Sequence, residues 1–219
     1  MEDVFSRLIT DRRLQVSGVH WASLINSYGC VQKDLSKAIT VFDSIEHHPS
    51  SVRSGVRMPD ALCYEAMLNV LVTLRRTDLI PTYLERLNNS GIHMTAYIAN
   101  LLIKGYAAAG QLEEAREVFE SLQDPPMGVA APNNHVPHDG SGSVPTVSPS
   151  APVYREPSTW EAMVRAELGA GNRDNAVALL QRVQARHFPQ AVYQRISGIM
   201  LDDSVVSPWT TPEALSPNC

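Results

Sequence analysis

The sequence predicts an all-α protein, specifically a right-handed α-solenoid of stacked helix-turn-helix repeats. Two observations support this fold class. Short amphipathic helical patterns occur in pairs, with only a tight turn between the members of a pair. The pairs also recur, and Glu65 and Asn100 occupy equivalent places in two of them at a separation of 35 residues. Because a helix of about twelve residues is marginal in water by itself, each pair must bury its apolar stripe against its neighbours, as in a solenoid.

The clearest hairpin spans residues 97–123. Its first helix is predicted to end at Ala109, where Gly110 breaks the helical pattern. Its second helix carries apolar residues at helical spacing and glutamates on the opposite face. The apolar residues are Leu112, Ala115, Val118, Phe119 and Leu122. This pattern predicts two short helices packed back to back.

Three further hairpins are predicted, the last with a capping helix, at residues 18–48, 62–95 and 158–200. The hairpin at 158–200 repeats the Ala-Gly break at Ala170-Gly171. In the hairpin at 62–95 the break has become Leu74-Arg75, so this copy is more divergent. We expect all three to fold as the clearest one does.

Several segments interrupt or flank this pattern. Residues 1–17 resemble the second helix of a truncated repeat; either the sequence is a piece of a longer array or it starts with an unpaired capping helix. Residues 124–157 are rich in Pro, Gly and Ser and predict a disordered insertion, which lengthens one interval between repeats. A shorter insertion is predicted at 47–60, and residues 201–219 predict a flexible tail.

The motifs of common enzymes and metal sites are missing from the sequence. His135 and His138 have no cysteine or carboxylate cluster beside them that would complete a tetrahedral metal site. The sequence contains no phosphate-binding loop and no nucleophile elbow. We therefore expect no enzymatic activity, no metal and no small-molecule cofactor. The three cysteines are widely spaced and odd in number, which favours unpaired structural roles, and no apolar run is long enough to predict membrane insertion.

The hairpin at residues 97–123 resembles the pentatricopeptide repeat (PPR) family. The stretch NLLIKGYAAAGQLEEAREVFESL follows that family's succession of Gly-Tyr, Ala-Gly, Leu-Glu-Glu-Ala and an apolar-aromatic pair. Met58-Pro59-Asp60 is a partial version of its repeat ending. The tetratricopeptide family would require a Trp-x-x-Leu-Gly-x-x-Tyr first helix, which no copy here has. The resemblance covers roughly residues 1–123 and 158–200, and the fold it implies agrees with the predicted solenoid.

The resemblance implies that each repeat reads one nucleotide of single-stranded RNA. Two residues would read the base, one near the start of the first helix and one at the end of the repeat. The first set of base-reading candidates is Ala22, Glu65, Asn100 and Glu161, and the second is Asp60 and Thr95. By resemblance Asn100 favours a pyrimidine, whereas Glu65 and Glu161 bring carboxylates that accept from a base amino group but repel the RNA backbone. The alternative is that these residues only line an exposed concave surface.

Positive charge is sparse. The formal net charge is -5, so any contact with phosphates must be local. Lys104 and Arg165 lie four residues, or one helical turn, after two of the reading candidates and are candidates for phosphate contacts. Arg75, Arg76 and Arg173 are further phosphate candidates near the turns. We expect this segment to bind RNA weakly, as the degenerate end of an array.

Two classes of function follow. The first is an RNA-binding PPR protein of an organelle, acting in transcript processing, stability or translation. Its partly regular repeats and long insertion are similar to fungal mitochondrial members, particularly translational activators of cytochrome c oxidase subunit mRNA. This resemblance alone implies a mitochondrial location, since no targeting peptide is visible, and it implies partners among proteins of the mitochondrial expression machinery. The second class is an α-solenoid scaffold that binds a peptide or a partner helix instead of RNA.

Overall fold

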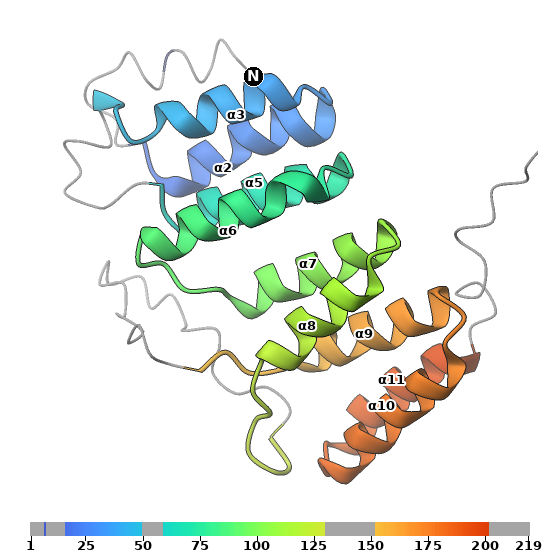
Figure 1. Ribbon diagram of the computed structural model, residues 1–219. Coiled ribbons are helices and arrows are strands. Elements are labelled where there is room, and N and C mark those ends of the chain that lie inside the picture. The colour runs from blue at the N-terminus through green and yellow to red at the C-terminus, as the bar shows by residue number, and fades with distance from the viewer. Residues whose placement is uncertain (1–6, 8–15, 50–58, 130–151, 202–219) are drawn as a thin grey trace, which may run out of the picture. The chain divides into compact units, whose positions relative to one another are not determined.

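The structure is a computed structural model that describes residue 7 and residues 16–49, 59–129 and 152–201. Within these ranges the regular secondary structure is helical apart from one isolated bridge between Gln123 and Tyr154 (Figure 1). This confirms the predicted all-α helical-repeat fold. The described residues divide between Gly105 and Tyr106 into two compact units. Unit 1 runs to Gly105, and unit 2 contains Tyr106 and the described residues after it.

Unit 1 consists of two helical hairpins and most of a further first helix. Its elements are α2 (Gly18–Asn26), the π-helical turn η1 (Ser27–Val31), α3 (Leu35–Ser44), α5 (Ala61–Thr73), the 3-10 turn η2 (Thr77–Leu79), α6 (Ile80–Asn89) and α7 (Ala96–Ala108), the last turn of which belongs to unit 2. Helices α2 and α3 form one hairpin, and α5 and α6 form the next. First helices are α2, α5 and α7, and second helices are α3 and α6.

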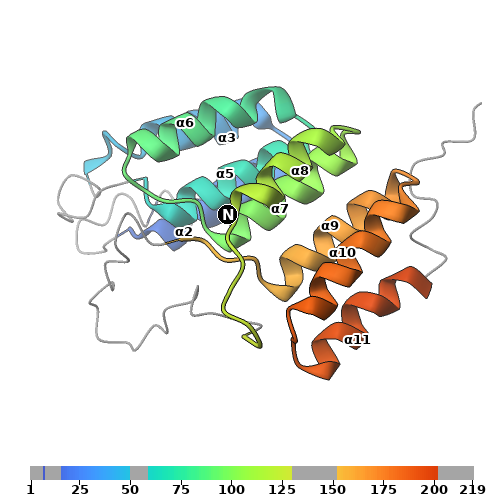
Figure 2. The ribbon, with the colours of Figure 1, turned by 60° about the horizontal axis from the view of Figure 1, so that its bottom comes forward.

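Unit 2 contains the remaining helices. They are α8 (Leu112–Ser121), α9 (Pro157–Gly169), α10 (Arg173–Ala185), α11 (Gln190–Gly198) and the 3-10 turn η3 (Ile199–Leu201). Helices α9 and α10 form a hairpin, and Figure 2 shows α11 packed beside them, where the sequence predicted a capping helix. The second helices of this unit are α8 and α10.

A left-handed residue closes each of the four hairpin turns. Lys33, Arg75, Gly110 and Gly171 have φ angles of 59°, 55°, 77° and 79°. Lys33, Gly110 and Gly171 directly precede the N-cap residues of α3, α8 and α10, and Arg75 precedes the N-cap of η2, which leads into α6. Glycine adopts this conformation without steric cost, whereas other residues rarely do. In the divergent hairpin Arg75 therefore adopts the left-handed conformation that glycine has in the equivalent turns. The turn keeps its geometry although the Ala-Gly pair is absent from the sequence.

Close backbone approach holds the first helices of unit 1 together. A Cβ atom added to Gly29 in η1 would lie 2.2 Å from Cγ2 of Val70 in α5, and one added to Gly105 in α7 would lie 2.5 Å from Cγ2 of Val72. Such distances are far inside van der Waals contact, so only glycine fits at either place. Gly105 is the glycine of the Gly-Tyr element of the repeat pattern, which thus has a packing reason.

The same arginine contact joins consecutive second helices in each unit. In unit 1 the Cζ of Arg86 in α6 lies 4.9 Å from the ring centroid of Phe42 in α3, and its Nη1 lies 2.9 Å from Oδ1 of Asp43. In unit 2 the Cζ of Arg182 in α10 lies 5.5 Å from the ring centroid of Phe119 in α8. The Nη1 of Arg182 lies 2.6 Å from Oε1 of the next residue, Glu120. A cation over an aromatic face and a neighbouring carboxylate stabilise both pairs of helices.

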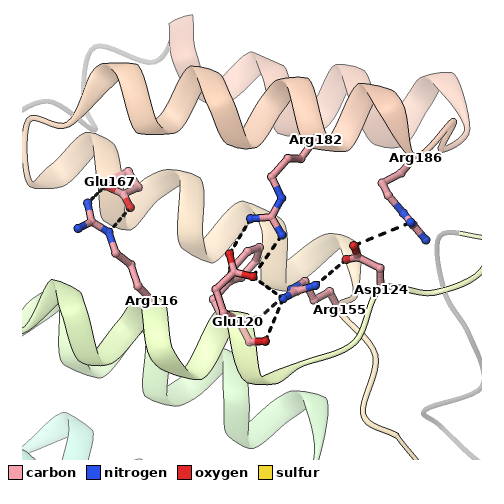
Figure 3. A network of polar contacts seen from close by, with 8 residues as sticks. Arg116, Glu120, Asp124, Arg155, Glu167, Arg182 and Arg186 are labelled. Atoms are coloured by element: carbon pink, nitrogen blue, oxygen red, sulfur yellow. Dashed lines mark hydrogen bonds and ion pairs between the residues drawn. The ribbon is translucent and has the colours of Figure 1, made fainter.

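The insertion in unit 2 is closed at its neck. The backbone of Gln123 accepts from the N–H of Arg155 at 2.8 Å and donates to the carbonyl of Val153 at 2.9 Å. Arg155 is 4% exposed and stacks on Phe119, with 4.6 Å between its Cζ and the ring centroid. Its guanidinium binds Glu120 and Asp124 (Figure 3). The chain therefore enters and leaves the insertion at one place, and α9 follows α8 closely in space.

This neck corrects the predicted insertion boundaries. The prediction placed residues 124–157 in a disordered segment, but residues 152–156 are held at the neck and Pro157 begins α9. Composition misled the prediction because the contacts of Arg155 are tertiary and leave no local periodic signal. Residues 130–151, most of 1–17, residues 50–58 of the shorter insertion and the tail after Leu201 lie outside the described residues.

Candidate nucleic-acid interface

The four first-set reading candidates occupy one position in their helices. Each lies five residues after the residue that caps its first helix. These pairs are Ser17 and Ala22, Asp60 and Glu65, Thr95 and Asn100, and Glu156 and Glu161. The register read from the sequence therefore corresponds to a common structural position, which we call the reading position.

In the second repeat the structure brings both reading candidates together. The hydroxyl of Thr95 donates to Oε1 of Glu65 at 2.9 Å. The same hydroxyl accepts from the N–H of Ile98 at 3.1 Å and so caps α7. Thr95 thus joins the end of one repeat to the reading position of that repeat and to the start of the next helix.

In the first repeat the second-set candidate has a structural task. Oδ1 of Asp60 accepts from the N–H of Cys63 at 3.1 Å and caps α5. The carboxylate also lies against Gly18, where an added Cβ would come within 1.8 Å of Oδ2. Burial, together with the negative charge of Asp60, raises the pKa of the Cys63 thiol well above its usual range. Asp60 therefore packs against Gly18 at the start of α2. Gly18 lies four residues before Ala22, which is half-buried.

The last repeat carries a reading candidate whose charge is compensated. Nε of Arg195 in α11 lies 2.5 Å from Oε1 of Glu161 in α9. The sequence suggested that this carboxylate would repel RNA, but the pairing offsets the charge. The signal was not visible beforehand because Arg195 lies 34 residues further along the chain, in the capping helix.

The third repeat has an uncharged polar residue at its reading position. Asn100 in α7 is half-buried, and its Oδ1 is fully covered. Lys104, one helical turn further on, is exposed. An amide and a cation therefore lie along one side of α7, in the order in which a base and a phosphate would require them.

An exposed apolar row in unit 1 was missed by the sequence reasoning. Val19, Leu62 and Tyr97 are 58%, 41% and 51% exposed. Each lies two residues after the N-cap and three before the reading position of its helix. We call them the apolar row. Counting from the N-caps would have revealed their common place.

A polar row lies on the other side of the reading positions, nine residues after each N-cap. In unit 1 it consists of Asn26, Asn69 and Lys104; Arg165 has the same register within unit 2. Nδ2 of Asn69 donates to Oδ1 of Asn26 at 3.1 Å, which links α5 to α2. Arg165 is exposed. The two predicted phosphate candidates on first helices thus share a register, and the two asparagines add side-chain amides to it.

The other phosphate candidates lie at hairpin turns. Arg75 closes the turn after α5, and Arg173 begins α10, where it is exposed. Arg76 forms a bidentate pair with Asp78, with both distances 2.8 Å. The turn lies ten residues beyond Glu65, which corresponds to about 15 Å along a helix. The structure therefore does not bring these arginines to the reading positions.

Other kinds of site find no support in the part of the chain that the structure describes. There, no three His, Cys, Asp or Glu side chains come together as ligands for a metal ion. No helix in the same ranges has the length and apolar character to cross a membrane.

Comparison with known proteins identifies the family. The family model described as pentatricopeptide repeat-containing protein matches residues 2–122, more than half of the chain. The chain therefore belongs to the pentatricopeptide repeat family.

Individual relatives agree with this assignment. Pentatricopeptide repeat-containing protein 5, mitochondrial, from Schizosaccharomyces pombe is 24% identical over 186 residues, which cover 84% of this chain and 12% of that protein. The chain thus spans about an eighth of its relative's length.

One solved structure agrees with this assignment in its fold. The maize pentatricopeptide repeat protein PPR10 is similar with a TM-score of 0.52 and 16% identity, over 90% of this chain and 23% of that one. The nuclear proteinaceous RNase P 2 of A. thaliana is less similar, with a TM-score of 0.46 and 13% identity over 86% and 36% of the two chains. The first likeness supports the fold, and the second is too weak to carry an argument.

Proposed function

We propose that this chain binds single-stranded RNA along the first helices of unit 1. The observation that carries the proposal is the common register of three kinds of side chain. Each first helix of this unit presents an exposed apolar residue, then a reading position, then a polar residue, at two, five and nine residues after its N-cap. Bases stack on exposed apolar and aromatic side chains, while polar and cationic groups hold the backbone.

The proposed binding is weak in this segment alone. Of the three polar-row residues in unit 1, only Lys104 is a cation, and the formal net charge of the chain is -5. Counterion release from few phosphate contacts gives little affinity. Since the chain spans 12% of its mitochondrial relative, most of the affinity would come from further repeats of a longer array.

We further propose that the array acts on mitochondrial transcripts, in their processing, stability or translation. The support is the name of the S. pombe relative, which assigns that protein to mitochondria. Partners among other proteins of the mitochondrial expression machinery belong to the same proposal.

The test is the salt dependence of binding to a random single-stranded RNA pool, measured by fluorescence anisotropy at about 50 and 200 mM salt. We expect weak binding that is lost at the higher salt. Lys104→Ala should weaken binding and lower the slope of log K against log salt by about one. Lys37→Ala on second helix α3 is the matched control and should leave both unchanged.

Two results of this experiment would contradict the proposal. Absence of binding at either salt would overturn the proposal and favour the protein-interaction scaffold, whose contacts would be apolar and insensitive to salt. Equal effects of Lys37→Ala and Lys104→Ala would move the RNA path away from the first helices.

A further inference from the structure

The hydroxyl of Thr95 has its proton committed to Glu65. It donates to Oε1 of Glu65 and accepts from the backbone N–H of Ile98. A hydroxyl has one proton, so Thr95 offers no hydrogen to a ligand in this arrangement. The polar surface that Glu65 and Thr95 present together is therefore an acceptor surface, dominated by the carboxylate.

Two exposed apolar residues lie close in sequence to Glu65 and Thr95. Leu62 lies one helical turn before Glu65 on α5, and Tyr97 lies two residues after Thr95 on α7. Helices α5 and α7 are neighbours in unit 1, as the contact between Glu65 and Thr95 and the close approach of Gly105 to Val72 require. We call the place defined by Leu62, Glu65, Thr95 and Tyr97 the repeat-two slot. It combines apolar surfaces on which a base can stack with a carboxylate, which accepts hydrogen bonds and cannot donate them.

The four RNA bases differ in how they meet a carboxylate. Single-stranded bases expose their Watson–Crick edges to proteins. On that edge guanine has two adjacent donors, N1–H and the N2 amino group, which match the two oxygens of a carboxylate. Cytosine and adenine each pair one amino donor with an adjacent ring-nitrogen acceptor, and uracil has one N–H between two carbonyl oxygens. A carboxylate accepts hydrogen bonds and cannot donate them, so it is repelled by the acceptors of the other three bases.

We propose that the repeat-two slot prefers guanine, with Glu65 as the specificity-determining residue and Thr95 as the residue that positions it. This inference rests on the proposed RNA binding. It also explains why a carboxylate stands at a position that faces RNA: the general repulsion of phosphates is offset only when a guanine occupies the slot. Glu65 would thus lower the affinity for RNA without a guanine at this place more than the affinity for RNA with one, and so distinguish the two.

The test compares four equal-length single-stranded RNAs at about 50 mM salt, where phosphate contacts are strong. One is U alone, and the others are U tracts that carry isolated guanines (the GU RNA), adenines or cytosines, spaced so that the strands do not pair with themselves. Runs of guanine are avoided because they self-associate. The wild-type chain should bind the GU RNA more tightly than each of the others by about fivefold or more, the lower end of what a bidentate base contact contributes. In Glu65→Gln this ratio should fall to about one, because an amide offers one acceptor and one donor and cannot accept from both guanine donors.

The same variant should bind the U-only RNA more tightly than the wild type does, since it has lost a negative charge. Opposite changes in base preference and general affinity separate a specific contact from a purely electrostatic one. Glu85→Gln, an equal change of charge at an exposed place on α6, should leave the GU preference intact.

Equal affinity of the wild type for all four RNAs, or a GU preference that persists in Glu65→Gln, would overturn this inference while leaving RNA binding in place. Failure of all four RNAs to bind would overturn the proposed function and this inference with it.

Discussion

Arg155 and Glu120 meet at the neck of the insertion, where Nη2 of Arg155 lies 2.8 Å from Oε2 of Glu120. The same guanidinium donates to the carbonyl of Phe119 at 2.9 Å and to Oδ1 of Asp124 at 2.7 Å (Figure 3). The buried Arg155 therefore holds the segment that leads into α9 against the end of α8. The insertion is therefore compatible with the repeat fold because its two ends are fixed to each other.

Replacing Arg155 by leucine should destabilise unit 2 strongly. The change removes the guanidinium from Phe119, Glu120 and Asp124 at once, while the two carboxylates keep Arg182 and Arg186. Loss of a hydrogen bond to a charged group typically costs about 1.5–3 kcal/mol. Urea unfolding followed by circular dichroism measures the difference. Arg173→Leu, at an exposed position of the same unit, should change the free energy of unfolding by less than about 1 kcal/mol. Similar effects of the two substitutions would contradict the role assigned to the neck.

The hairpin turns predict a difference between two glycines of unit 2. Gly171 has φ of 79°, Gly198 does not lie in the left-handed region, and neither has an atom within 4 Å of an added Cβ. Gly171→Ala should therefore lower stability by about 1–2 kcal/mol through backbone strain alone. Gly198→Ala should be neutral or stabilise slightly, since alanine favours the helix. Thermal unfolding of both variants tests this, and equal melting temperatures would show that the turn is not constrained as described.

The close approach of η1 to α5 predicts a compensating pair. Gly29→Ala places a methyl group 2.2 Å from a methyl of the buried Val70 and should cost about 1–3 kcal/mol through overpacking. Val70→Ala removes the obstructing methyls and leaves a small cavity. The double variant should be more stable than the sum of the single effects by at least about 0.5 kcal/mol. Strict additivity in a double-mutant cycle of urea unfolding would mean that the two residues do not contact each other.

The buried thiol of Cys63 predicts a loss of stability at alkaline pH. Its pKa is raised in the folded chain by burial and then by Asp60, whereas an unfolded thiol has a pKa of about 8.5. Below that pH both states are protonated and the thiol contributes no pH dependence. Above it the unfolded state releases a proton that the folded state retains, so stability falls by up to about 1.4 kcal/mol per pH unit.

Cys63→Ala removes this contribution. Urea unfolding of the wild type and the variant between about pH 8 and 10 should show a steeper decline for the wild type. Parallel declines would indicate that Cys63 ionises equally in both states.

The sequence predicted hairpins well and their contacts poorly, for physical reasons. Helical periodicity and the Ala-Gly breaks are local signals, and they located the helices around Ala109 and Ala170. The pairing of Glu161 with Arg195 is tertiary, so no local pattern reports it. The π-helical turn at Ser27–Val31 was also missed, since its residues read as an ordinary continuation of α2. The apolar row was missed because an isolated exposed valine or leucine is unremarkable until its common place after each N-cap is known.

The most direct test of the account is to locate bound RNA on the chain. Single-stranded RNA that contains thiouridine is photo-crosslinked at low salt, and the modified peptides are identified by mass spectrometry. The account predicts crosslinks in the first helices of unit 1, foremost in the peptide of α7 that contains Tyr97 and Asn100, and their loss at high salt. Crosslinks confined to the second helices α3 and α6 would contradict the proposed RNA path.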